Sequence, residues 1–213
     1  MSRGWSSARC TTVSGRRFLV GLVAVLAVAV LPACGGESRE LAGYSVEPVP
    51  TVGDIVLPDL ANDGADFALR ADPGKILVVY FGYTNCPDFC PNTMANVKLA
   101  KEELDDPADL QMAMVTVDPA RDLDTLASYV TSFIADAHAL GTADDAVLNR
   151  AASAFGVSYD VATDASGEIQ VAHTTFLYAV DDSGHVVLGW PFGVSIDDLA
   201  ADIDQLLDSP QAG

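Results

Sequence analysis

Apolar and polar residues alternate along the chain in blocks that predict a series of strands and helices after residue 70. Residues 76–81, Ile-Leu-Val-Val-Tyr-Phe, form a continuous apolar run typical of a strand buried on both faces. A second strand is predicted at 110–117. Strands at 175–180 and 186–190 are joined by an Asp-Asp-Ser-Gly sequence that favours a hairpin turn. Apolar positions at helical spacing predict helices over 92–104, 122–133, 144–155 and 195–207.

This order of elements predicts an α/β protein with a central mixed β-sheet flanked by helices. Residues 51–69 are expected to form short extended segments around an Asn-Asp-Gly turn. Cys86 and Cys90 lie between the first long strand and the first helix, which is where the thioredoxin fold has its active site. We therefore expect a thioredoxin-like domain over residues 51–209.

The first 33 residues have the features of a signal peptide. Two arginines at 16 and 17 precede an apolar run at 18–31, which is short for a membrane span. The run ends in Leu-Pro-Ala-Cys, which resembles a bacterial lipobox in which Cys34 is lipidated and becomes the new N-terminus. Residues 34–50 are rich in Gly, Pro and Glu and are predicted to be a flexible tether.

Two other interpretations of this N-terminal segment are ordinary secretion and an uncleaved anchor. All three place the domain on the extracytoplasmic face of the membrane, and the lipobox makes it lipid-anchored there. The arginine pair also matches part of a twin-arginine export signal, so the export route is open.

The charge of the chain argues against nucleic-acid binding. Eleven basic and 30 acidic residues give a net charge of −19. Four of the arginines belong to the signal segment, which has no acidic residue, so the remainder is more acidic still. Nucleic-acid binding depends on Lys and Arg that neutralise phosphates. An acidic surface instead attracts basic partners or cations, or only keeps the domain soluble.

The positions of Cys86 and Cys90 indicate a metal-binding or redox role rather than a structural disulfide. They stand where a helix N-terminus favours thiolate over thiol. In helical geometry, four steps bring the two sulfurs to within about 40° of each other around the axis. The pair is thus able to chelate one ion when reduced, or to close a disulfide when oxidised. A purely structural disulfide is the alternative, but so short a loop stabilises a fold little.

His173 is the candidate third ligand. It directly precedes the strand predicted from residue 175, whose start faces the cysteine loop in a thioredoxin fold. Thioredoxins hold a cis-proline at this point, and this chain has none there. His138, expected in an exposed loop between helices, and His185, expected beside the hairpin turn at the surface, are weaker candidates.

Four segments together resemble the SCO/SenC family of copper proteins that serve cytochrome c oxidase assembly. They are Phe-Gly-Tyr-Thr-Asn-Cys-Pro-Asp-Phe-Cys-Pro at 81–91, Val-Asp-Pro-Ala-Arg-Asp at 117–122, His-Thr-Thr-Phe-Leu at 173–177 and Asp-Ser-Gly at 182–184. The resemblance implies that Cys86, Cys90 and His173 are copper ligands. It also places Asp118 near the site, where it orients a ligand or helps a partner dock, with turn formation as the alternative.

The resemblance implies a copper metallochaperone that delivers copper to the CuA site of oxidase subunit II. Two thiolates and one imidazole suit Cu(I), with Cu(II) as a second state, whereas structural zinc normally takes four protein ligands. A thiol–disulfide reductase that keeps the CuA cysteines reduced, or a redox or copper sensor, is the main alternative. A peroxidase is the weakest, because the chain has no recognisable peroxiredoxin motif. Further partners are another copper chaperone, a thioredoxin-like reductant and the membrane, and we expect no enzyme activity beyond thiol exchange.

Overall fold

A seven-stranded mixed sheet forms the centre of the protein, in a computed structural model that describes residues 39–209. The strand order is β2-β1-β5-β4-β3-β8-β9. Neighbours β3, β4 and β5 run parallel, and the remaining pairs are antiparallel. The strands are β1 (Val56–Asp59), β2 (Ala65–Ala68), β3 (Ile76–Gly82), β4 (Leu110–Thr116), β5 (His138–Leu140), β8 (Leu177–Val180) and β9 (Val186–Trp190).

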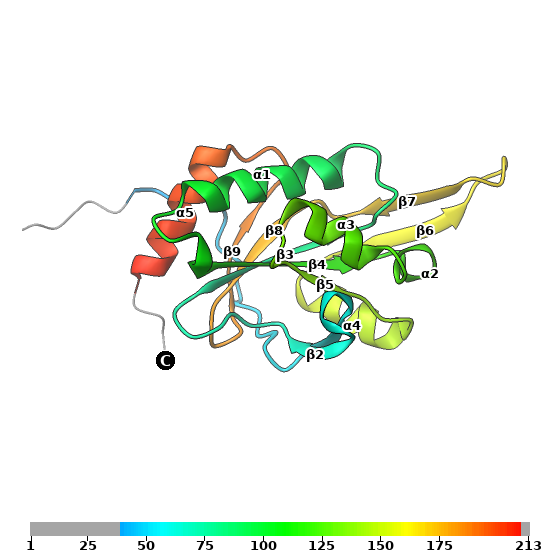
Figure 1. The fold of residues 1–213 in the computed structure, drawn as a ribbon, viewed down its shortest axis with the longest axis horizontal. Helices are drawn as coiled ribbons and strands as arrows, with labels where there is room; N and C mark the ends of the chain where they lie inside the picture. The colour runs from blue at the N-terminus through cyan, green and yellow to red at the C-terminus, as the bar shows by residue number, and fades with distance from the viewer. Residues whose placement is uncertain (1–38, 210–213) are drawn as a thin grey trace, which may run out of the picture. The chain divides into compact units, whose positions relative to one another are not determined.

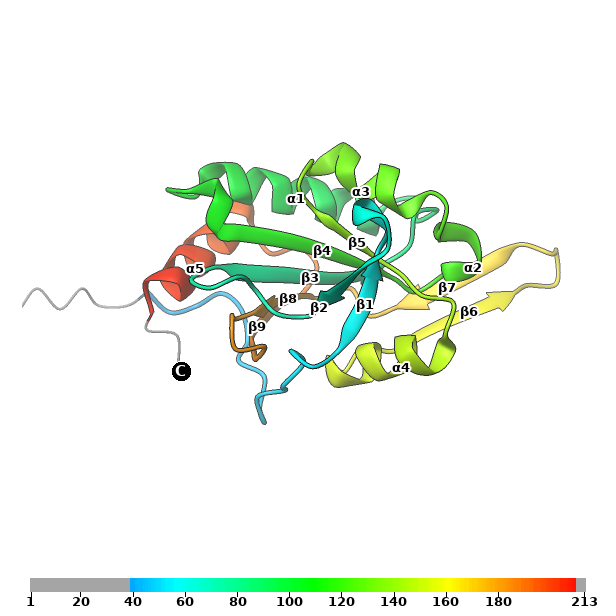
Figure 2. The ribbon, with the colours of Figure 1, turned by 60° about the horizontal axis from the view of Figure 1, so that its bottom comes forward.

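Helices cover both faces of this sheet (Figures 1 and 2). Helices α1 (Phe89–Glu103), α3 (Leu126–Phe133) and α5 (Ile196–Asp208) pack on one face, and α4 (Asp145–Ala154) packs on the other. Every residue of β3 is buried, and its alternate side chains enter the two opposite cores. The predicted thioredoxin-like α/β fold with a mixed sheet is confirmed.

The helix predicted over residues 122–133 is wrong in extent. The chain instead forms a short helix α2 (Pro119–Asp122), a break, and then α3. The Asp122 side chain does not cap a helix, because it binds groups on the cysteine loop and on β4. Two 3₁₀ turns complete the helical elements, η1 (Leu60–Asn62) and η2 (Pro107–Asp109).

Strand β5 was predicted to be a loop between helices. It contains His138, which is partly buried and lies in the sheet rather than in an exposed loop. Because β5 is short, its apolar pattern gave no signal. Strand β8 begins at Leu177 rather than at residue 175, and α1 begins at Phe89 rather than at residue 92.

A two-stranded hairpin, which the sequence pattern did not predict, leads to His173. It consists of β6 (Tyr159–Thr163) and β7 (Ile169–His173), and it projects from one end of the molecule (Figure 1). Residues 160–170 are all exposed, so the hairpin lacks the buried face that makes a strand recognisable. Because β7 ends at His173, this histidine is the last residue of a strand, whereas it was predicted to precede one.

Residues 39–50 lie against the domain, although they fall in the segment predicted as a tether. Tyr44 pairs with Gly189 of β9, and Arg39 forms ion pairs with Asp198 and Asp202 of α5. The folded unit therefore begins before residue 51. The predicted signal peptide and the lipidated Cys34 lie outside the described residues. None of the helices within 39–209 is long and apolar enough to cross a bilayer.

Candidate metal centre

The cysteine loop connects the end of β3 to the start of α1. Gly82 closes β3 where the chain passes Cys90, and a Cβ there would lie 3.1 Å from the Cys90 sulfur and 2.7 Å from the Tyr80 ring. Only glycine fits at so close an approach. Cys86 lies in the loop and is 8% exposed, and Cys90 lies in the first turn of α1 and is fully buried.

The two cysteines are free thiols with different surroundings. The backbone N–H of Cys90 donates to Cys86 Sγ at 3.3 Å, as expected for a sulfur at a helix N-terminus. Burial raises the pKa of the Cys86 thiol, but hydrogen bonds from the Cys90 and Asp88 backbone and from side chains outweigh burial and lower it. Burial raises the pKa of Cys90 to about 12. Cys86 is therefore the more nucleophilic sulfur.

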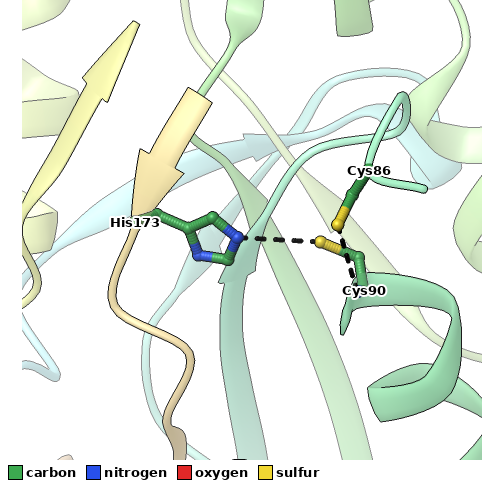
Figure 3. A group of neighbouring side chains, drawn as sticks. All are labelled: Cys86, Cys90 and His173. Atoms are coloured by element: carbon green, nitrogen blue, oxygen red, sulfur yellow. Dashed lines mark hydrogen bonds between the residues drawn. The ribbon is translucent and has the colours of Figure 1, made fainter. Parts of the chain in front are cut away.

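His173 points from the end of β7 toward both sulfurs (Figure 3). Its Nε2 lies 3.8 Å from Cys90 Sγ, and its Nδ1 lies 2.9 Å from the Thr174 carbonyl oxygen. Since a carbonyl only accepts hydrogen bonds, Nδ1 carries the proton and Nε2 presents a lone pair to the sulfurs. Burial lowers the pKa of His173, which favours the neutral imidazole that metals bind.

Two tyrosines complete the walls of the site. The Tyr80 hydroxyl donates to Cys90 Sγ at 3.5 Å. The rings of Tyr80 and Tyr83 lie 6.0 and 5.7 Å from the imidazole of His173, both in edge-on arrangements. Sequence analysis did not identify these tyrosines as part of the site, although both fall within or beside the segment at 81–91.

The donor atoms fit one small soft ion. The ligand atoms of Cys86, Cys90 and His173 all lie within 4.8 Å of one another. Bond lengths of about 2.3 Å to sulfur and about 2.0 Å to nitrogen would separate the donors of a trigonal site by about 3.7–4.0 Å. Movements of less than 1 Å thus suffice to close the three donors around an ion. Two thiolates and an imidazole are donors that select Cu(I).

Asp122, rather than Asp118, contacts the cysteine loop. Its fully buried carboxylate accepts hydrogen bonds from the Thr84 N–H at 3.0 Å, the Thr84 hydroxyl at 2.6 Å and the Thr116 hydroxyl at 2.6 Å. Asp118 is also buried, but its carboxylate pairs with the guanidinium of Arg121. The family resemblance placed Asp118 near the site, whereas the contact of Asp122 with the cysteine loop was not predicted.

The other two histidines have partners of their own. His138 Nδ1 lies 2.8 Å from the buried carboxylate of Asp59, which ties β5 to β1. His185 Nδ1 lies 3.4 Å from Asp181 at the β8–β9 turn, and its side chain is 39% exposed. Neither belongs to the Cys86–Cys90–His173 group.

Comparison with known proteins identifies the family. A sequence model of the SCO1/SenC family matches residues 60–208. Mitochondrial SCO proteins of human and yeast are 30–31% identical over 52–59% of this chain, and the matches cover only 38–43% of their own lengths. The chain thus corresponds to less than half of each of these relatives.

Solved structures agree with this match. Apo Sco1 of Thermus thermophilus is 29% identical with a TM-score of 0.68, and the match covers 80% of this chain and 99% of that one. Yeast Sco1 with copper bound is 27% identical with a TM-score of 0.64, covering 76% and 91%. BsSco, 19% identical, is described as a member of the Sco family of cytochrome c oxidase assembly proteins. With the matched region spanning most of the described residues, the chain belongs to the SCO1/SenC family.

Proposed function

We propose that this protein is an extracytoplasmic copper metallochaperone that delivers copper to the CuA site of cytochrome c oxidase subunit II. Cys86, Cys90 and His173 hold the copper, and a lipid on Cys34 keeps the domain at the outer face of the cytoplasmic membrane. The observation that carries the proposal is the convergence of two sulfurs and an unprotonated imidazole nitrogen within 4.8 Å. A copper-bound yeast Sco1 of the same fold supports it.

Delivery requires a site that holds copper and also releases it. Three protein donors leave Cu(I) open to a fourth ligand from an acceptor, so ligands are exchanged one at a time. Cys86 stands at the more exposed side of the pair, whereas Cys90 is enclosed by α1 and Tyr80. We expect an acceptor thiolate to displace Cys86 first, with Cys90 and His173 released afterwards.

A thiol–disulfide reductase is the second candidate, and the lowered pKa of Cys86 favours it. The Cys86 thiolate would attack a disulfide of the CuA domain and form a mixed disulfide. Cys90 would then displace the partner, which leaves as a dithiol while Cys86 and Cys90 become a disulfide. This reaction transfers two electrons from the chain to its partner and needs no imidazole, so His173 separates the two functions.

Copper retention by a His173 variant tests the proposal. The chain from residue 35 onward, which contains the whole folded unit, is reduced, loaded with Cu(I) without oxygen and desalted. We expect one copper per chain in the wild type. Mutating a residue that only hydrogen-bonds to a metal ligand lowers metal affinity roughly 10–100-fold. His173→Ala removes a ligand itself, so it should lower copper affinity by more than this. His185→Ala is the matched control and should retain one copper.

Equal retention by wild type and His173→Ala would exclude the three-ligand site. In that case, reduction of an oxidised CuA domain by wild type and by a Cys86→Ser variant would test the reductase directly.

A further inference from the structure

The metal centre lies between two exposed apolar surfaces. Eight large apolar side chains within residues 39–209 are more than a third exposed, and four of them lie at the first residue of α1, on the β6–β7 hairpin or just after β9. Exposed apolar side chains that cluster, unlike those scattered singly over a surface, often mark an interaction site. These four side chains are Phe89, Val161, Ile169 and Phe192.

On one side is an aromatic pair. Phe89 stands directly before the ligand Cys90 and is 45% exposed. Phe192 follows the end of β9, is 42% exposed, and packs edge-on against Phe89 with ring centroids 4.8 Å apart. Gly193, whose φ is +92°, forms the turn after Phe192. Two exposed rings are thus held against each other at the rim of the cysteine loop.

On the other side is one face of the hairpin. The β6–β7 register pairs Tyr159 with His173, Val161 with Val171 and Thr163 with Ile169. Since side chains alternate along a strand, these six residues share a face, and that face carries the ligand His173. Val161 and Ile169 are each 41% exposed. The opposite face carries Asp160, Ala162, Gln170 and Ala172.

The hairpin face and the cysteine loop are turned toward each other. An open hollow of about 450 Å³ lies between them, bounded by Asn85 and Pro87 of the loop and by Ile169 and Val171 of β7. Ile169 is four residues from His173, or about 13 Å along the strand. A standard protein interface of about 800 Å² per partner has a radius of about 16 Å, so one interface centred on the metal would cover both surfaces.

Apart from Arg121, the charged residues around these surfaces are acidic. The chain has no Lys or Arg between Lys75 and Lys98, and none after Arg150. These two stretches supply the cysteine loop, the hairpin and the segment around Phe192. Their exposed charges are acidic, and Asp88, Glu168 and Asp197 are examples. Arg121, which borders the hollow, is paired with Asp118. A protein that covers the centre therefore needs an apolar contact surface with basic residues around it.

We propose that Phe89, Phe192 and the His173 face of the hairpin form a docking surface for a copper-accepting protein whose own metal site has an apolar rim and a basic surround. This inference rests on the proposed function, with the CuA domain as the occupant. The aromatic pair and the hairpin hold the acceptor on either side of Cys86 while ligands exchange.

Copper transfer from docking-surface variants tests this assignment. Cu(I)-loaded wild type, Phe192→Ser and Ile169→Ser are mixed with a purified CuA domain of oxidase subunit II, and copper in the acceptor is measured over time. The matched control is Leu99→Ser, because Leu99 is 43% exposed on α1 but lies more than two helical turns beyond Cys90. A small-molecule Cu(I) chelator serves as an acceptor that needs no docking.

We expect Phe192→Ser and Ile169→Ser each to slow transfer to the CuA domain about five- to tenfold, the effect of losing an apolar anchor. Transfer to the chelator, copper content and thermal unfolding should match the wild type, and Leu99→Ser should behave as wild type throughout. Raising the salt concentration should slow wild-type transfer to the CuA domain, because exposed charges are screened.

Equal transfer rates in all four proteins would overturn the docking surface and leave the proposed function intact. Binding of the copper-free proteins to the CuA domain is measured in parallel. It detects the opposite outcome, in which the docking surface is real but the proposed function is wrong. If the wild type binds but delivers no copper, and Phe192→Ser weakens binding, the docking surface stands and the metallochaperone function fails. A wild type that dimerises through Phe192 and does not bind the CuA domain would make this face a self-association surface and overturn the proposal.

Discussion

At the scale of single residues, the sequence singled out the three side chains that the structure brings together as candidate metal ligands, but not the residues that position them. Cys86, Cys90 and His173 carry chemistry that few other side chains offer, so their spacing and neighbours were informative. Asp122 and Tyr80 act through hydrogen bonds to groups that only the fold brings near. The Asp122 carboxylate joins Thr84 of the cysteine loop to Thr116 at the end of β4, 32 residues along the chain. No local pattern reveals such a link.

Asp122→Ala tests this link. The substitution leaves one backbone N–H and two hydroxyls without their acceptor in a buried position. Hydrogen bonds to a charged group contribute about 1.5–3 kcal/mol each, so we expect the free energy of unfolding to fall by at least about 3 kcal/mol. Urea denaturation measures it. The control is Asp124→Ala, an exposed neighbour that should change stability by less than about 0.5 kcal/mol. A similar small change in both would mean that Asp122 serves only the local turn.

At the scale of elements, buried segments were predicted well and exposed ones poorly. Strand β3 is buried at every position and lies within one residue of its prediction. The β6–β7 hairpin has almost no buried side chain, so its sequence gave no periodic signal. The hairpin was recognisable only by its turn, where Asp164 accepts hydrogen bonds from the N–H groups of Ser166 and Glu168 and from side chains.

The turn makes the hairpin sensitive to acid. Hydrogen bonds from the Ser166 and Gln170 side chains and from backbone N–H groups lower the pKa of Asp164 to about 2. A carboxyl whose pKa is lowered on folding adds stability above its unfolded pKa of about 4, and that contribution is lost as the pH falls toward 2. We expect amide hydrogens of residues 159–173 to lose protection over this range, while those of β3 and β4 keep theirs. Hydrogen exchange followed by mass spectrometry measures both.

The matched variant for this prediction is Asp164→Ala. In this variant, the amide hydrogens of residues 159–173 should already be less protected at pH 7 than in the wild type. Their protection should not fall further through this turn below pH 4. If wild type and variant lose protection along the same pH curve, another carboxylate controls the hairpin.

At the scale of the whole molecule, a buried carboxylate fixes where the chain enters the domain. Asp202 of α5 is fully buried and accepts hydrogen bonds from Trp190 Nε1 at 2.8 Å and from the Gly43 N–H at 2.9 Å. It also pairs with Arg39. The described chain therefore begins beside α5, at the end of the molecule opposite the hairpin (Figure 1). Sequence analysis predicted a tether here because the segment lacks apolar periodicity, and it is held by these polar contacts together with the packing of Leu41 and Val46 against the core.

On the proposed lipid anchor, this arrangement would limit how far the domain reaches from the membrane. If Cys34 carries a lipid, only residues 34–38 separate it from Arg39, and five residues span at most about 18 Å. Releasing residues 39–50 would add up to about 40 Å of chain. With a lipid on Cys34, the contacts made by Asp202 would limit the length of the free tether and keep the α5 end, rather than the hairpin end, near the lipid.

Asp202→Ala should release this segment. The substitution leaves the indole N–H of Trp190 and two backbone N–H groups without their acceptor, and it removes one of the two carboxylates that pair with Arg39. We expect a loss of about 3 kcal/mol in the free energy of unfolding and proteolytic cleavage within residues 39–50 at concentrations that spare the wild type. Asp204→Ala, a partly exposed position on the same helix, is the control and should stay resistant. Copper binding should persist in both variants, because no metal ligand contacts this end. A resistant Asp202→Ala protein would show that the pairing of Tyr44 with Gly189 holds the segment without the carboxylate, and the length of the tether would then be set by β9 rather than by α5.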